Sequence, residues 1–230
     1  VAMSNYPYQS QSVASAPSAG AVLASNRLIR NTYMLLAMTL LFSAATAGTA
    51  MALNLPHPGI LITLLGFFGL LFLTYKLQNS AWGLAAVFAL TGFMGLTLGP
   101  ILNAYLNMPN GHQTVMMALG GTGAIFIGLS AYALTTRKDF SYMGGFLFAG
   151  ILVAFLVGLG AIFFSMPGLA LAVSAMFVLL MCGLILYQTS QLVSGGETNY
   201  ILATVTLYVS IYNLFTSLLH LLGAFFGRDD

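Results

Sequence analysis

Charged side chains are scarce in this sequence. Only 4% of its 230 residues are charged, six basic and four acidic, whereas 59% are hydrophobic. The mean hydropathy is +0.95. Soluble domains carry about 25% charged residues, so this composition excludes a soluble surface. The formal net charge of +2 is too small to suggest a nucleic-acid partner. The composition predicts an all-α membrane protein that crosses the bilayer several times.

Cysteine and buried acids are also lacking. The single cysteine, Cys182, excludes an internal disulfide and a multi-cysteine metal site. All four acids, Asp139, Glu197, Asp229 and Asp230, fall in loops or in the C-terminal tail. Proton and cation pathways commonly place carboxylates at membrane depth. Their absence disfavours a carboxylate-based pump or calcium site but leaves a neutral polar pore open.

Seven apolar segments are each about as long as a bilayer requires, roughly 20 residues. Short separators rich in Pro, Gly and Asn divide them. The expected spans are 32–53, 59–76, 81–103, 114–136, 143–164, 168–190 and 201–224. We expect a flexible tail over 1–26, a seven-helix domain over 27–226 and a short C-terminal tail over 227–230.

Basic residues orient these spans, because positively charged loops stay in the cytoplasm. With seven spans, all but one of the basic residues share one side: Arg27, Arg30, Lys76, Arg137 and Lys138, with Arg228 opposite. This predicts a cytoplasmic N-terminus and an external C-terminus.

The last span carries a polar stripe. Polar residues recur at gaps of seven, four, three, four and three along one helical face: Asn199, Thr206, Ser210, Asn213, Ser217 and His220. Unpaired polar groups are costly in hydrocarbon, so we expect this helix at the centre of the bundle. The stripe could supply interhelical hydrogen bonds or line a pathway. The lack of an acid favours the first interpretation.

Few other residues suggest chemistry. No GxSxG or HExxH motif occurs. Cys182 and His220 should lie roughly 12 and 30 Å from the inner boundary, too far apart for a nucleophilic pair. We expect no enzyme activity, metal or cofactor. The histidines His57, His112 and His220 map to the outer side, where scattered surface positions are favoured over a pH sensor.

Five polar residues near the cytoplasmic side complete the candidates. Gln188 of the sixth span is the expected facing partner of the stripe. The run from Arg137 through Lys138 to Asp139 is expected to anchor the topology with a local ion pair. Glu197 is expected to cap the last helix, and a contact between this loop and a partner is a secondary possibility.

Three motifs resemble a known family. They are LGPILN at 98–103, SAYALTTRKDFSYMGGFLFAG at 130–150 and GGETNYILATVTLYVSIYNLF at 195–215. Together they resemble the Bax inhibitor-1 (transmembrane BAX inhibitor motif) family, and within it the bacterial YccA-like branch. The resemblance covers about 27–226. It implies a seven-helix fold with a central last helix, placed in the bacterial inner membrane with the C-terminus in the periplasm.

The resemblance implies two alternative functions. Calcium-leak members use an aspartate pair on the sixth and seventh spans as a pH-responsive latch, and Gln188 and Ser210 stand at the matching positions here. YccA-like members instead bind the membrane AAA protease FtsH as poorly degraded substrates that modulate it. We therefore expect an FtsH modulator that inhibits by competition through its tail, with a weakened pH-modulated calcium leak as the alternative.

Overall fold

The computed structural model describes residues 19–226, and their side chains from Ser25 onward. All regular structure in this range is helical. The helices are α1 (Ala19–Ala52), α2 (Ile60–Leu77), α3 (Trp82–Leu106), α4 (Gly111–Thr136), the short 3₁₀ helix η1 (Ser141–Met143), α5 (Gly144–Phe163), α6 (Pro167–Ser194) and α7 (Tyr200–Phe226). The seven α-helices are all long and apolar enough to cross a membrane, which confirms an all-α protein with seven candidate spans.

The first helix begins earlier than predicted. Residues 19–26, expected as part of a flexible tail, form the start of α1. Residues 1–18 and 227–230, including Arg228, lie outside the described residues. Residues 19–26 carry no charge, so their composition resembles that of the tail before them. They include several alanines, the strongest helix formers, which is consistent with the longer helix.

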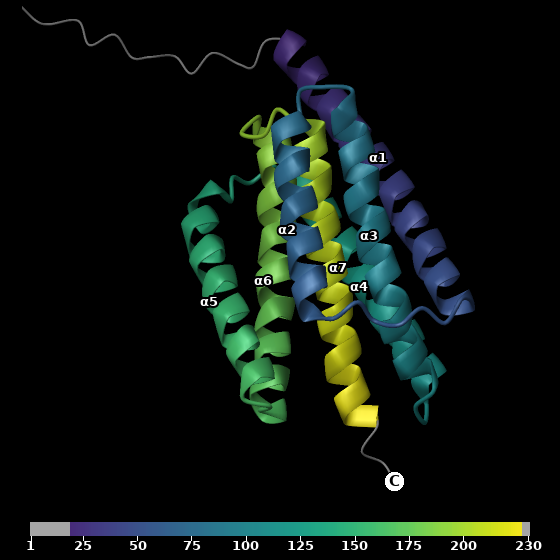
Figure 1. The fold of residues 1–230 in the computed structure, drawn as a ribbon. Coiled ribbons are helices and arrows are strands. Elements are labelled where there is room, and N and C mark those ends of the chain that lie inside the picture. The colour runs from purple at the N-terminus through teal and green to yellow at the C-terminus, as the bar shows by residue number, and fades with distance from the viewer. Residues whose placement is uncertain (1–18, 227–230) are drawn as a thin grey trace, which may run out of the picture.

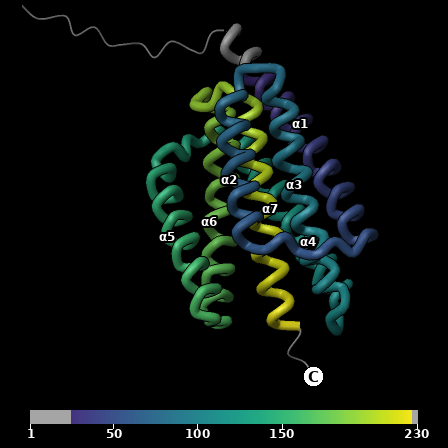
Figure 2. The backbone as a smooth tube through the Cα atoms, in the orientation of Figure 1, coloured from purple at the N-terminus to yellow at the C-terminus, as the bar shows by residue number. Residues whose placement is uncertain are grey.

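The helix α7 lies inside the bundle (Figures 1 and 2). It packs against α1, α3, α4 and α6, and it has the largest buried share of the seven spans. Three hydrophobic clusters succeed one another along it, and each contains α7 residues: Leu207 in the first, Leu214 in the second and Leu219 in the third. Four helices, α1, α3, α4 and α6, therefore surround α7.

Small residues bring α1 and α3 into close contact. A Cβ atom at Gly95 would overlap the Thr46 hydroxyl and the Ser43 carbonyl, and one at Gly99 would lie 2.8 Å from the Ala47 carbonyl oxygen. Helices in a membrane have no hydrophobic driving force between them, so they gain stability from the close approach of their backbones at small residues. This interface makes α1 an integral part of the bundle.

The α2 and α5 helices are the least enclosed. Thr74 is the buried residue of α2, and α2 packs on α3 while α5 packs on α6. Their direct aromatic contact is an edge-to-face pair of Phe68 and Phe155, with ring centroids 5.9 Å apart.

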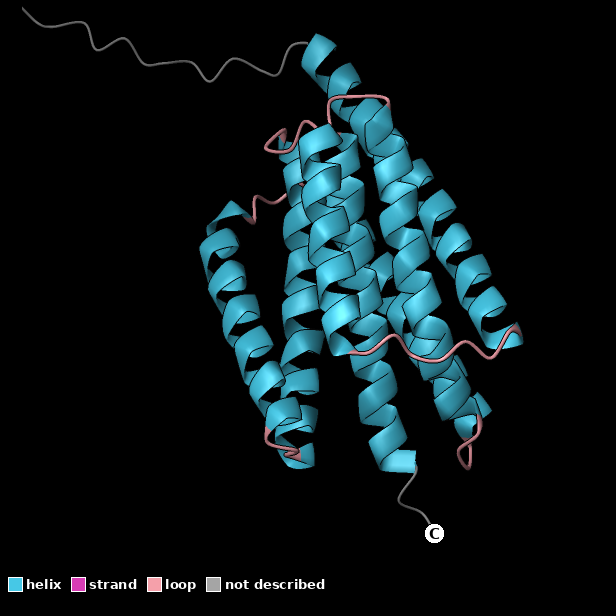
Figure 3. Cartoon of the chain, viewed as in Figure 1, coloured by secondary structure: helices cyan, strands magenta, loops and turns pink. Residues whose placement is uncertain are grey.

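The loops lie at the two ends of the bundle (Figure 3). We call the end that holds the α2–α3, α4–α5 and α6–α7 loops the basic end, because Lys76, Arg137 and Lys138 lie there beside the first turns of described α1. The opposite end holds the α1–α2, α3–α4 and α5–α6 loops.

Candidate functional site

The stripe on α7 begins with a helix cap. Asn199 Oδ1 accepts hydrogen bonds from the backbone N–H groups of Ile201 (2.9 Å) and Leu202 (3.3 Å). Asn199 Nδ2 donates to the Gln78 carbonyl at 3.2 Å and to Asn79 Oδ1 at 3.1 Å. One amide therefore starts α7 and ties it to the α2–α3 loop.

Glu197 supports this cap rather than forming it. Its Oε1 accepts from the backbone N–H groups of Thr198 (2.8 Å) and Asn199 (2.7 Å). Both residues precede Tyr200, the first residue of α7. The carboxylate thus orders the turn that positions Asn199.

The middle of the stripe bonds to its own helix. Ser210 is fully buried, and its hydroxyl donates to the Thr206 carbonyl at 2.7 Å. Asn213 Nδ2 donates to the Val209 carbonyl at 2.8 Å. Ser217 is also buried. Ser210 and Asn213 thus use the carbonyl four residues earlier, which short polar side chains in helices commonly do.

A neighbouring face of α7 supplies hydrogen bonds to α1 and α3. Tyr208 bonds to Ser43 of α1 at 2.6 Å and donates to the Thr91 carbonyl of α3 at 3.3 Å. Tyr212 lies 3.4 Å from Thr97 of α3, while Thr204 donates to a carbonyl of α1 at 3.2 Å. The sequence analysis missed these residues, although their spacing of four is the signal of a second stripe.

Gln188 is buried on α6, and its Nε2 has no hydrogen-bond partner among the described residues. The hydroxyls of Thr32 and Ser130 share this condition. No hydrogen bond therefore joins the Gln188 amide nitrogen to Ser210. The aspartate pair of the calcium-leak members is replaced at these two positions by Gln188 and Ser210. The pair therefore has no carboxylate with which to bind a cation or titrate.

The three histidines differ in environment. His57 and His112 are exposed, as expected. His220 is not a surface residue: it is half-buried, and its Nδ1 lies 2.8 Å from the Ser174 hydroxyl of α6. The sequence did not predict the contact with Ser174, because His220 lies near the end of the last span, where we expected a surface position. Within residues 19–226, no cluster of three or more His, Cys, Asp or Glu could hold a metal ion.

The charged loop 137–139 is anchored to α6 by a serine. The Ser190 hydroxyl donates to the Lys138 carbonyl at 2.9 Å and accepts from the Phe140 N–H at 3.0 Å. Asp139 accepts from the N–H and hydroxyl of Ser141, and these hydrogen bonds lower the pKa of the Asp139 carboxyl. Ser141, and not the adjacent cations expected from the sequence, is the partner of Asp139 in the described chain.

Comparison with known proteins identifies the family. The model of the family described as "Inhibitor of apoptosis-promoting Bax1" matches residues 25–227. The chain belongs to the Bax inhibitor-1 family. The resemblance read from the three motifs is therefore confirmed.

Relatives lie within the same bacterial branch. The chain is 52% identical over 217 residues to "Modulator of FtsH protease YccA" of Escherichia coli K12, covering 94% of this chain and 98% of that protein. An uncharacterized protein of Pseudomonas aeruginosa is 55% identical over 202 residues, covering 88% and 91% of the two chains. The corresponding protein of a second Escherichia coli strain is named "Inner membrane protein YccA".

These names also bear on location and class. With seven candidate spans and inner-membrane relatives, the chain is a multi-pass protein of the bacterial inner membrane. The family name and the Escherichia coli name describe an inhibitor and a modulator, rather than an enzyme.

Proposed function

We propose that this protein binds the membrane protease FtsH and slows its proteolysis of other substrates by competition. The observation that carries the proposal is the 52% identity, across 94% of the chain, to a relative named as a modulator of FtsH protease. The basic end would face the cytoplasm and the C-terminus the periplasm, following the positions of the basic residues. The N-terminal segment would then lie on the side where an ATP-driven protease can engage it.

The packing of α1 supports competition as the mechanism. A protease that pulls on the N-terminal segment pulls first on α1. The Ser25 hydroxyl donates to the Leu192 carbonyl at 3.1 Å, and Tyr33 lies 3.3 Å from the Thr189 hydroxyl, so α6 holds the start of the helix. Ser43 of α1 is hydrogen-bonded to Tyr208 of α7. The second half of α1 packs closely against glycines of α3. Extraction must break all of these contacts together.

The primary test measures modulation directly. FtsH is reconstituted in proteoliposomes with a second membrane substrate, with or without the full-length chain. We expect slower degradation of that substrate, increasing with the amount of the chain, and crosslinks between the two proteins. An unchanged degradation rate at saturating amounts would refute the proposal.

A paired glycine substitution tests the resistance to extraction. Gly95→Ala places a methyl group against the backbone of α1, whereas Gly120→Ala, the control on α4, meets no atom within 4 Å. We expect FtsH to degrade the Gly95→Ala protein faster than the parent, while the Gly120→Ala protein persists. Equal lifetimes for all three would contradict a role for α1 packing.

A cation leak is the second candidate, and the unpartnered amide nitrogen of Gln188 is the observation that favours it. A buried N–H donor without a partner is costly, and since it cannot bind a cation directly, it marks a place for a water molecule, beside which a hydrated ion would pass. The neutral Gln188 and Ser210 favour little flux and little response to pH, and calcium flux into proteoliposomes tests this.

A further inference from the structure

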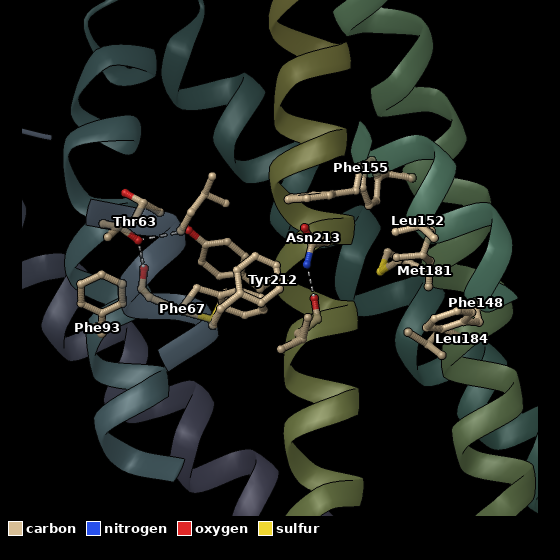
Figure 4. A pocket seen from close by; sticks show the side chains of 17 residues that line it. Thr63, Phe67, Phe93, Phe148, Leu152, Phe155, Met181, Leu184, Tyr212 and Asn213 are labelled. Carbon is tan, nitrogen blue, oxygen red and sulfur yellow. Dashed lines mark hydrogen bonds between the residues drawn. The ribbon is translucent and has the colours of Figure 1, made fainter. Parts of the chain in front are cut away.

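A cavity of about 390 Å³ opens beside α7, among α2, α3, α5 and α6 (Figure 4). Its walls are almost entirely carbon, and six phenylalanines line it: Phe67, Phe68, Phe93, Phe148, Phe155 and Phe177. The volume falls in the range of small-molecule sites, about 300–1,000 Å³. Apolar walls of this kind favour apolar molecules over water.

The cavity lies near the middle of the membrane. Asn213 is on its wall and stands 13 residues after Tyr200, the start of the 27-residue helix α7, which places it roughly 20 Å along the helix. Molecules that reach this depth come from the hydrocarbon phase. None of the lining residues is charged, so a charged group would be costly to bury here.

The cavity is open toward the bilayer between α2 and α5, where Phe68 is 48% and Phe148 72% exposed. Phe68 of α2 and Phe155 of α5 meet edge to face at the cavity wall. The two helices otherwise pack on different neighbours, α3 and α6. A molecule in the bilayer would therefore reach the cavity sideways, past Phe68 and Phe155, without breaking the α6–α7 contact.

Asn213 gives this apolar cavity a polar group with unused bonding capacity, whereas the wall hydroxyls have partners within the protein: Thr63, Thr97 and Tyr212. Its Nδ2 uses one proton on the Val209 carbonyl, and this is the single hydrogen bond its side chain makes within the described residues. The other N–H and Oδ1 remain for a ligand at the cavity wall, where Figure 4 shows the amide between the α2–α3 and the α5–α6 sides. A partly buried amide with unused bonding capacity at this depth favours a ligand that supplies a partner.

We propose that this cavity binds a neutral lipophilic molecule from the bilayer that carries one hydroxyl group. The apolar body lies among the phenylalanines, and the hydroxyl donates to Asn213 Oδ1 and accepts from the free N–H of Nδ2. A plain hydrocarbon chain would fill the volume but leave the amide unpaired. This proposal is independent of FtsH modulation.

Photolabelling of the full-length protein in nanodiscs tests the site. The probe is a long-chain alcohol with a diazirine near the hydroxyl, and the matched control is the same diazirine alkane without the hydroxyl. We expect saturable labelling of the cavity-lining residues by the alcohol, with a preference over the alkane of about tenfold, because each of the two hydrogen bonds to Asn213 contributes a factor of about three.

Three variants locate the binding. Asn213→Leu should remove the preference for the alcohol, and Ile151→Trp should fill the cavity and abolish labelling. Leu156→Trp is the control, because Leu156 lies on the exposed side of the same helix α5, and should label like the parent. If Ile151→Trp does not fold by size-exclusion chromatography, Ile151→Phe replaces it.

Two outcomes would overturn the proposal. Equal labelling by alcohol and alkane that Asn213→Leu leaves unchanged would show occupation by lipid chains without recognition. Labelling that survives the filled cavity, or that maps outside it, would show that the probe binds elsewhere.

Discussion

The hydroxyl of Tyr208 should hold three helices together at the centre of the bundle. Its ring is 1% exposed, and its hydroxyl bonds to Ser43 of α1 and to the Thr91 carbonyl of α3. Tyr208→Phe keeps the ring and removes both bonds. The bond to Ser43, at 2.6 Å, is the stronger, while 3.3 Å to Thr91 is long for an O–H donor.

The magnitude follows from these two bonds. A net intramolecular hydrogen bond contributes about 0.5–1.5 kcal/mol, and interhelical bonds in membrane proteins average about 0.6 with a maximum of about 1.7. We expect Tyr208→Phe to lower the free energy of unfolding by about 1–2 kcal/mol. About 1 kcal/mol of this should be coupling to Ser43, since the shorter bond dominates.

A double-mutant cycle of Tyr208→Phe with Ser43→Ala measures that coupling. The free energy of unfolding is followed by far-UV circular dichroism during reversible unfolding in mixed micelles. Thr49→Ala is the matched control on α1, because the Thr49 hydroxyl donates to the Ala45 carbonyl of its own helix. Coupling to Ser43 within the additivity error, about 0.3–0.5 kcal/mol, would refute this reasoning.

Three further predictions concern the basic end and the α6–α7 contact. Asn199→Ala should lower the free energy of unfolding by about 1–2 kcal/mol through the lost cap, and Asn199→Ser, which retains a capping oxygen, should recover part of it in the same assay. Gln188→Glu with Ser210→Asp should make calcium flux into proteoliposomes pH-sensitive. A flux through the parent protein that steepens between about pH 6 and 8 would contradict the inference that Gln188 and Ser210 carry no titratable group. Hydrogen bonds from Ser141 lower the pKa of the Asp139 carboxyl. The ionised carboxylate therefore stabilises the loop above the ordinary aspartate pKa, and this stabilisation is lost as the pH falls through the lowered value. Ser141→Ala should raise the pKa of Asp139 in a carboxyl NMR titration.

The number of spans and the inner place of α7 could be predicted from the sequence. Hydrocarbon requires long apolar runs, and a polar stripe on such a run must avoid lipid. These constraints act on composition and spacing alone. The partners of the stripe could not be predicted, because Ser210 and Asn213 donate to carbonyls of their own helix rather than to a neighbouring helix.

The polar contacts that join the helices depend on rotation and close approach. Tyr208 reaches Ser43 only because of the rotation and separation of α7 and α1 in the folded bundle. From the sequence alone, a tyrosine in a span resembles an interfacial or apolar residue. His220 likewise finds Ser174 on α6, a pairing that spacing within α7 does not reveal. The cavity around Asn213 is formed by five helices, so no single segment predicts it.

The start of α1 changes the design of the decisive experiment. Residues 19–26 belong to α1, so a deletion that tests the N-terminal segment should remove 3–18 and leave the helix intact. The measurement is the rate at which reconstituted FtsH degrades a second membrane substrate in the presence of the full-length or the deleted chain. Competition through this segment predicts that the full-length chain slows degradation and that the deleted chain, equally folded and equally inserted, does not. Equal slowing by both chains would contradict it.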